Sequence, residues 1–518
     1  MSWVLAAPII IPFATAVLAF LFRGGAEGRW LSVVGSFALL IASGVLMVEV
    51  LDHGVVAAQM GTWAAPFGIT LVADLLSAVM VVITGITGLA VAVYALADVD
   101  KAKEQLGYHA LFQVLLAGVC GAFLTGDLFN LYVWFEVMLI SSFGLLILGG
   151  KKVQLDGGIK YVTLNLVSTI LFLSGVGLLY GMTGTLNMAD LHGRVQDVEN
   201  QGLLVVVAIM FMVAFGVKAA VFPLFFWLPA SYHTPAFSVS AIFAGLLTKV
   251  GVYALIRTFT LIFTIDVAFT HTILLWVAGF TMVTGVLGAA AMNDMRRILS
   301  FHIVSQIGYM ILGLALFTPL AIVVAVFYLV HHIIVKANLF LVAGVAQRIA
   351  GSTDLDRIGG LYKYAPFLGV LFLIPAFSLA GFPPLSGFWA KYVLVKASLD
   401  IGAYWIAAIA LIVGLLTIYS MTKIWGNAFW KPHPDATVQP RLSSLPALDR
   451  TALLVPIASL AILTCIIGFF PEPFVAFAER SAEQLLNPEA YVTAVLGEPI
   501  LDPVEPVDPD VAQVEGTE

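Results

Sequence analysis

Long apolar stretches alternate with short polar connections along almost the whole chain of 518 residues. Several of these stretches exceed the roughly 18 apolar residues that indicate a membrane-spanning helix. The first stretch has no basic segment before it and is followed by Arg23 and Arg29, so it is predicted to be a true span and not a cleaved signal peptide. Fourteen spans are predicted, over residues 2–22, 30–51, 71–97, 108–125, 127–149, 161–183, 202–226, 237–262, 269–292, 300–317, 319–346, 366–396, 402–426 and 451–470.

The composition supports a membrane protein and argues against a soluble enzyme. The chain is 61% hydrophobic and 11% charged, whereas soluble domains are about 45–50% apolar and about 25% charged. Cys120 and Cys465 lie in apolar surroundings and are interpreted as small buried hydrophobic residues. The sequence has no nucleophile–base pair, phosphate-binding loop or metal-ligand spacing. We therefore expect no metal, no cofactor, no nucleic-acid partner and no enzymatic activity.

The basic residues of the loops predict the orientation in the lipid bilayer. Loops that follow odd-numbered spans carry fifteen Lys and Arg residues, whereas the opposite loops and the termini carry only Arg194 and Arg480. Because basic loops stay on the cytoplasmic side, both termini are predicted to face outward. The net charge of -7 comes largely from an acidic tail, and residues 471–518 are predicted to form a disordered outer segment.

Five charged residues fall near the middle of predicted spans and are the strongest functional signal. Together they would cost roughly 12–17 kcal/mol if nothing compensated for them. One alternative is a set of buried ion pairs that merely orient helices, but ionisable residues at membrane depth generally mark ion paths. The five residues are Glu136, Lys218, Lys249, Lys336 and Lys391. Arg257, Lys396 and Lys423 lie nearer span ends, where long side chains can reach the interface.

The spacing of polar residues suggests a connected path. Lys249, Tyr253 and Arg257 recur every four residues and share one helical face. His332 lies one turn before Lys336, with His331 beside it. Ser305 and Gln306 of the preceding span could add polar lining. Chains of such groups with trapped water can conduct protons.

Two spans contain helix-breaking residues at matched positions. Pro223 follows Lys218, and the group Gly381, Pro383 and Pro384 precedes Lys391. Broken helices at membrane depth occur where the backbone is buried or lines a wet cavity. The breaks lie five spans apart, which predicts two inverted five-helix repeats with the path between them. The expected divisions are spans one to three in 1–107, the repeats in 108–262 and 263–426, a cytoplasmic loop with span fourteen in 427–470, and the tail in 471–518.

These segments resemble the antiporter-like subunit family shared by respiratory complex I, membrane-bound hydrogenases and Mrp-type multisubunit sodium/proton antiporters. The similarity extends over residues from about 70 to 425. The matching stretches are YVWFEVM, VKAAVFPLFFWLP, SAIFAGLLTKVGVYALIR, NDMRRILSFHIVSQIGYM, HHIIVKANLFLVAG and LAGFPPLSGFWAK. Within the family the chain is most similar to the D-type subunits of Mrp antiporters. In the stretch after Pro223 it departs from the complex I pattern, because Ala230, Ser231 and Tyr232 replace Asp-Ala-His and His233 is the nearest histidine.

The resemblance implies a role for each matched residue. Glu136 and Lys218 would form a coupled pair, Lys249 a central relay, Lys336 the next step and Lys391 a site near the exit. We hypothesise that pairing and unpairing of the first two residues drive stepwise proton transfer. Asp74 matches a family acidic position, although a helix N-cap is the favoured explanation for it.

The resemblance also implies the setting of the chain. It would be a proton-translocating subunit in the bacterial plasma membrane, with other membrane subunits of the same complex as partners and protons, and possibly Na⁺, as the transported ions. The predominance of Lys over Asp and Glu in the interior favours protons, because an amine offers no oxygen to a hard cation. Two alternatives stay open: a proton-pumping subunit of a redox-driven complex, and a structural or assembly subunit without an active path.

Overall fold

The computed structural model describes residues 2–497. The first half contains a two-stranded antiparallel sheet and the helices that run up to the first helix break. Its elements are α1 (Ser2–Leu21), α2 (Glu27–His53), β1 (Val56–Gln59), η1 (Met60–Thr62), β2 (Thr70–Ala73), α3 (Leu75–Asp98), α4 (Lys101–Gln105), α5 (Tyr108–Leu124), α6 (Leu128–Ile147), α7 (Lys152–Thr183), α8 (Met188–Arg194), η2 (Val195–Asp197) and α9 (Gln201–Ala219).

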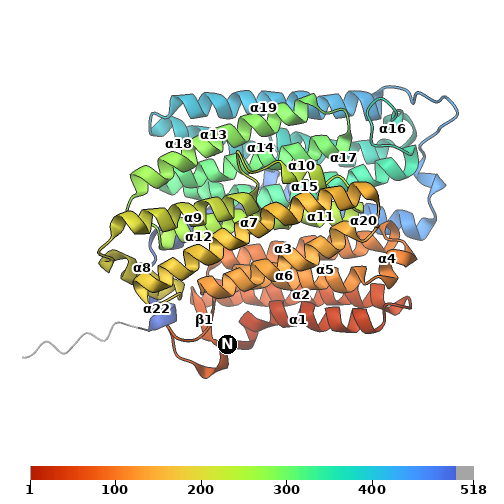
Figure 1. Ribbon diagram of the computed structural model, residues 1–518. Helices are drawn as coiled ribbons and strands as arrows, with labels where there is room; N and C mark the ends of the chain where they lie inside the picture. Colours follow the sequence, from red (N-terminus) through yellow and green to blue (C-terminus); the bar gives the residue numbers. More distant parts are fainter. Residues whose placement is uncertain (1, 498–518) are drawn as a thin grey trace, which may run out of the picture.

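The second half continues the bundle of roughly parallel and antiparallel helices (Figure 1). Its elements are α10 (Trp227–Ser231), α11 (Phe237–Ile242), η3 (Phe243–Leu247), α12 (Thr248–Leu261), α13 (Val267–Ala291), α14 (Met295–Leu316), α15 (Pro319–Ala350), α16 (Leu361–Tyr364), α17 (Pro366–Ala380), α18 (Ser386–Asp400), α19 (Tyr404–Ile424), η4 (Trp425–Trp430), η5 (Leu442–Ser444), α20 (Ala447–Phe469), α21 (Glu472–Leu486) and α22 (Glu489–Leu496).

The chain is an all-α polytopic membrane protein, as the sequence predicts. Within residues 2–497, twelve helices are long and apolar enough to cross a membrane, and Tyr108–Leu124 and Pro366–Ala380 are shorter apolar helices. These helices fall on the predicted apolar segments. The exact count of fourteen spans and the inverted repeats remain predictions. The short hairpin of β1 and β2 was not expected from the sequence.

Helices α12, α14 and α15 form the centre of the bundle. Almost every residue of α12 and α14 is buried, and α15 is buried from Ala321 to Ala346 with few exceptions. A helix that is apolar all round is normally buried on every side, which accounts for their position. Lys249, Arg257 and Lys336 on these helices are therefore enclosed by protein, whereas Arg297 and Arg348 near the helix ends are exposed.

Both predicted helix breaks are present. Helix α9 ends at Ala219, and Ala220 caps it with a left-handed backbone at φ 62°. Helix α17 ends at Ala380, and Gly381 caps it at φ 94°. Pro223 follows the first cap, and Pro383 and Pro384 follow the second. Each break thus joins two helices through non-helical backbone, α9 to α10 and α17 to α18.

Two expectations from the sequence are wrong. Arg257 does not extend to the membrane interface, because its side chain is only 4% exposed and forms an ion pair with Asp74. The segment assigned to a disordered tail begins with two helices, α21 and α22, which pack against the bundle. The most acidic part of that tail, residues 498–518, lies outside the described residues.

Candidate functional site

Glu136 and Lys218 lie close together without forming an ion pair. The Glu136 carboxylate on α6 accepts a hydrogen bond of 2.7 Å from the Thr169 hydroxyl on α7. The Lys218 ammonium in the last turn of α9 lies 5.6 Å from the centre of the Phe135 ring. The two charges are within electrostatic range of one another, but no contact of 4.0 Å or less joins them.

A small cavity adjoins Lys218. Its lining includes Tyr161, Asn165, Trp227 and Gly251, and it has room of about 20 Å³ for water. That volume is enough for one water molecule. Most of the lining is apolar, and its polar members are Tyr161, Asn165, Trp227 and Lys218. The Tyr161 hydroxyl also lies 2.6 Å from the Ser142 hydroxyl. A water molecule here would join the Lys218 ammonium to these groups.

Lys249 is completely buried at the beginning of α12. Its ammonium donates a hydrogen bond to the Ala244 carbonyl oxygen in the preceding helical segment. That segment, Phe243–Leu247, is a π-helix inside an otherwise α-helical span. Single π-helical turns are rare and frequently occur at functional sites. The π turn therefore supplies a backbone partner for a buried charged group.

Helix α15 places a histidine and a lysine next to Lys249. His332 and Lys336 are completely buried, and His332 lies within electrostatic range of Lys249, Lys336 and Lys391. The Lys336 ammonium donates a hydrogen bond of 3.0 Å to the Leu299 carbonyl. Neither ring nitrogen of His332 has a hydrogen-bond partner within the described part of the chain. Buried polar atoms without protein partners are normally satisfied by water, so this part of the interior suits a hydrated relay.

Lys391 lies at the second helix break. Its ammonium donates to the Leu379 carbonyl at 2.8 Å and to the Ala380 carbonyl at 3.2 Å. It also lies 4.9 Å from the centre of the Tyr309 ring. Both carbonyls belong to the last turn of α17, whose final carbonyls have no partners within the helix. The break therefore provides the acceptors for the buried ammonium.

His331 is connected to the same break. Its Nδ1 atom lies 2.8 Å from the Ser386 hydroxyl, which is 2.9 Å from the Ser378 hydroxyl. Its Nε2 atom has no hydrogen-bond partner among residues 2–497. Among the seven residues of the predicted path, Lys249, His331, His332 and Lys336 are buried, whereas Glu136, Lys218 and Lys391 are half-buried. Their roles in transport remain to be tested.

The predicted lining residues do not all face this region. Gln306 accepts a hydrogen bond of 2.5 Å from the Tyr328 hydroxyl, and Tyr328 stacks on Tyr309 beside Lys391. Ser305 instead donates to the Met282 carbonyl at 3.1 Å and joins α14 to α13. His233 lies near the basic end of the bundle, where its Nε2 atom is 3.5 Å from Arg297. The structure therefore separates His233 from the buried row.

His302 is a further buried histidine that sequence reasoning missed. It is completely buried, lies within electrostatic range of Lys336 and Lys391, and its Nε2 atom is 2.5 Å from the Ser420 hydroxyl. Its Nδ1 atom has no hydrogen-bond partner in the described structure. The sequence did contain a signal, because His302 lies three residues before Ser305 and four before Gln306, on one side of the same helix.

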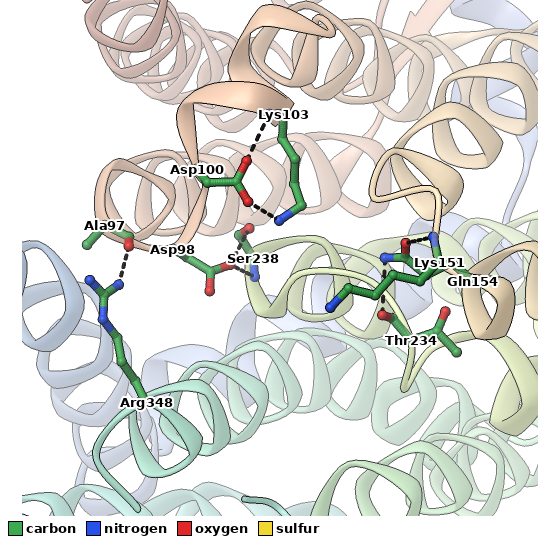
Figure 2. Close-up of polar contacts among 9 residues, drawn as sticks. All are labelled: Ala97, Asp98, Asp100, Lys103, Lys151, Gln154, Thr234, Ser238 and Arg348. Carbon is green, nitrogen blue, oxygen red and sulfur yellow. Dashed lines mark hydrogen bonds and ion pairs between the residues drawn. The ribbon is translucent and has the colours of Figure 1, made fainter. Parts of the chain in front are cut away.

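A polar cavity of about 350 Å³ opens at the end of the bundle where the basic loops gather. Figure 2 shows Lys103, Lys151 and Arg348 around it, with the Asp98 carboxylate between them. The Ser238 backbone N–H and hydroxyl donate to this carboxylate at 2.8 and 2.7 Å. Outside the spans, a hydrogen bond from Lys103 lowers the pKa of Asp100. This cavity could admit water and protons to the interior.

Arg296 connects the wall of that cavity to the helix whose backbone contacts Lys336. It lines the cavity and donates to the Pro235 carbonyl and the Ser240 hydroxyl at 2.5 and 2.7 Å. Leu299, whose carbonyl holds the Lys336 ammonium, lies three residues further along α14. Three residues of helix rise by roughly 4.5 Å. The cavity and the buried row are therefore close neighbours along α14.

Comparisons with known proteins agree with this architecture. Residues 125–417 match the family described as NADH:quinone oxidoreductase/Mrp antiporter, TM. The D subunit of the Na⁺/H⁺ antiporter of Alkalihalophilus pseudofirmus is 48% identical, over 95% of this chain and 99% of that protein. The D subunit of the Na⁺/H⁺ antiporter of Bacillus subtilis is 42% identical, over 95% of this chain and 99% of that protein.

Two solved structures share the fold along almost the whole chain. A chain of the Mrp complex from Dietzia sp. DQ12-45-1b has a TM-score of 0.85 and 35% identity, and the match covers 96% of this chain and 100% of that one. A chain of the membrane-bound sulfane sulfur reductase, an archaeal respiratory membrane complex, has a TM-score of 0.88 and 25% identity, with 95% and 100% covered.

Proposed function

Because the chain belongs to the NADH:quinone oxidoreductase/Mrp antiporter family of transmembrane proteins, we propose that it is the proton-translocating subunit of a multisubunit sodium/proton antiporter. The observation that supports this most directly is the buried row of ionisable residues inside a polytopic bundle. Most of its members have backbone, hydroxyl or aromatic partners, and the ring nitrogens of His332 are available to water beside two lysines. Chains of this kind suit protons better than Na⁺ because amines and imidazoles offer no oxygen ligands.

The relatives give the setting of this activity. Two that match along their full length are named as D subunits of Na⁺/H⁺ antiporters, and a matching structure is an Mrp complex. The chain is therefore a multi-pass subunit of the bacterial plasma membrane, with other membrane subunits as partners and a transport role. An outward position of both termini is supported by the fifteen basic residues on alternate loops. It also agrees with Figure 1, in which the N-terminus and α22 lie at the same end.

We infer a stepwise path through the row. When Glu136 contacts Lys218, the carboxylate stabilises the ammonium, and when they separate the buried ammonium becomes unfavourable. The proton then passes toward Lys249, and from there by way of His332 to Lys336 and Lys391. The separated arrangement, in which Thr169 holds the Glu136 carboxylate, would be the releasing state of this cycle.

The experiment uses everted membrane vesicles that contain the assembled complex and are energised without NADH. Collapse of the pH gradient on addition of sodium is compared for wild type, Glu136→Gln and the control Glu199→Gln, which changes an exposed carboxylate. We expect collapse in wild type and the control, and loss of collapse in Glu136→Gln at equal assembly. Collapse at the wild-type rate in Glu136→Gln would refute the relay.

A second function is favoured by one observation. The fold matches a respiratory membrane complex with a TM-score of 0.88, so a redox-driven pump remains the alternative. If wild-type vesicles show no response to sodium, this alternative replaces the antiporter.

A further inference from the structure

A buried ion pair closes one end of the helical face that carries Lys249. Arg257 lies two turns beyond Lys249 on α12, and its guanidinium is 2.6 Å from Asp74 Oδ2. The two side chains are 4% and 2% exposed. The other carboxylate oxygen of Asp74 accepts a hydrogen bond of 2.8 Å from the Ser77 backbone N–H. Asp74 is thus both the N-cap of α3 and the counter-ion of Arg257.

Hydroxyl groups connect this pair to the middle of α12. Tyr253, one turn from both Lys249 and Arg257, has its hydroxyl 2.9 Å from the Ser77 hydroxyl. Arg257 donates to the same Ser77 hydroxyl at 3.3 Å. The Tyr253 hydroxyl also donates to the Phe123 carbonyl at 2.8 Å. Polar contacts through the Ser77 hydroxyl therefore connect the Tyr253 hydroxyl to the ion pair.

The C-terminal helices cover the pair from outside. The ring of Tyr491 on α22 lies 5.1 Å from the Arg257 guanidinium and is 4% exposed. Helix α22 lies beside α8 and β1 at this end of the bundle (Figure 1). On α21, the Gln484 side chain accepts a hydrogen bond of 2.9 Å from the Leu75 backbone N–H. These contacts fasten the segment over the first turn of α3.

A purely structural purpose explains this arrangement poorly. A buried ion pair loses much of its attraction to desolvation, and apolar residues of similar size stabilise a fold as well or better. The pair is moreover aligned with Lys249 and is separated from outside water by a segment that packs on the surface of the bundle. An ion pair shielded from water by the C-terminal helices is suited to exchange protons with the outside while preventing passive proton leak.

We propose that Asp74 and Arg257 form the outer exit of the path from Lys249, and that the segment 472–496 is its lid. This proposal rests on the proposed function. The Lys249 ammonium gives up a proton to intervening water, the Tyr253 and Ser77 hydroxyls each accept one proton while passing on another, and the Asp74 carboxylate receives the last proton and becomes a neutral carboxyl. The carboxyl then returns the proton to water when Tyr491 moves aside, and the ion pair forms again.

The first test removes both charges together in the complete complex. Asp74→Asn keeps the N-cap, because Asn caps as well as Asp, and Arg257→Gln leaves no unpaired cation. We expect the double variant to assemble normally, to keep the wild-type half-saturating sodium concentration, and to lower the maximal rate of sodium-driven proton movement at least tenfold. A wild-type maximal rate would overturn the exit, whereas absence of antiport in the wild-type complex would overturn the proposed function instead.

The second test examines the lid and does not depend on assembly of the double variant. Tyr491→Ala removes the ring over Arg257, and Tyr491→Phe is the matched control because it keeps the ring. In the reconstituted complex without sodium, with a membrane potential imposed, we expect Tyr491→Ala to raise passive proton leak several-fold and Tyr491→Phe to match wild type. Equal leak in the two variants would overturn the lid.

Discussion

The contact between α9 and α12 offers a sharp test of the geometry of the buried row. Gly251 lies two residues after Lys249, and its α-carbon faces the backbone of the last turn of α9, which carries Lys218. A β-carbon at this position would lie 2.6 Å from the Ala219 backbone nitrogen and 2.9 Å from the Lys218 carbonyl carbon. Both obstacles are backbone atoms, so no side chain can rotate away. Gly251→Ala must therefore move one helix relative to the other.

The size of the effect follows from these distances. Ordinary contacts begin at 3.4 Å, so the helices must separate by about 0.8 Å, which is 3.4 minus 2.6. Overpacking of this kind costs about 1–3 kcal/mol. A displacement of about 1 Å at reacting groups can lower a rate by about 10²-fold. We expect a lower melting temperature and antiport reduced by at least tenfold, because Lys218 moves away from Lys249.

The control is Gly177→Ala on α7, where an added β-carbon meets no atom within 4 Å. Both variants replace glycine by alanine within a helical span, so they differ mainly in the space available. Thermal unfolding of the purified complex and the vesicle assay would be compared with wild type. Normal antiport in Gly251→Ala would show that the close contact between the two helices does not set the geometry of the row.

Three further predictions concern other parts of the chain. Thr169→Val removes the hydrogen bond to the Glu136 carboxylate. Because hydrogen bonds to charged groups contribute about 1.5–3 kcal/mol, we expect roughly tenfold slower antiport in this variant and a nearly wild-type rate in Thr169→Ser. Equal antiport rates in the two variants would contradict this prediction. Ala220→Gly relieves the left-handed backbone at φ 62° and should raise the melting temperature slightly. The expected gain in the free energy of unfolding is about 0.5 kcal/mol after the conformational entropy of glycine is subtracted. Gly381→Ala, at φ 94°, should lower the melting temperature. Outside the spans, a hydrogen bond from His109 and the charge of Arg29 lower the pKa of Glu104. This stabilisation is present above the ordinary carboxyl pKa and is lost as pH falls through the lowered value. Glu104→Gln should therefore lower the melting temperature at pH 7, and the difference from wild type should shrink as the pH falls below the ordinary carboxyl pKa.

Much of the bundle could be predicted because apolar length and helix breakers are local signals. The C-terminal helices were missed for a different reason. Glu472–Leu486 contains four charged residues, and the acidic residues beyond it suggested a solvated tail. Yet Ala478, Ser481, Ala482 and Leu485 are the buried residues of this helix, and their spacing of three and four indicates a one-sided helix. The hairpin of β1 and β2 has strands of four residues, too short to stand out between two spans.

The site was predictable in its members but not in its contacts. Glu136 and the four lysines could be identified from sequence because charged residues at membrane depth are costly and generally have a functional role. Contacts between residues distant in sequence could not be predicted from the sequence. Arg257 pairs with Asp74, and Lys336 contacts the Leu299 carbonyl. Arg257 was expected to reach the interface because its position near a span end was visible, whereas its counter-ion was not.

The two broken helices stabilise their lysines in different ways, and this difference bears on mechanism. Lys391 follows its break and contacts the Leu379 and Ala380 carbonyls, where the end of α17 presents its partial negative charge. Lys218 precedes its break, in the last turn of α9, and its nearby anionic group is Glu136 on another helix. Backbone carbonyls at a helix end are fixed, whereas a glutamate side chain can change rotamer and partner. We therefore propose that the first half is the part that switches, and that the second half holds a proton until the first half has switched.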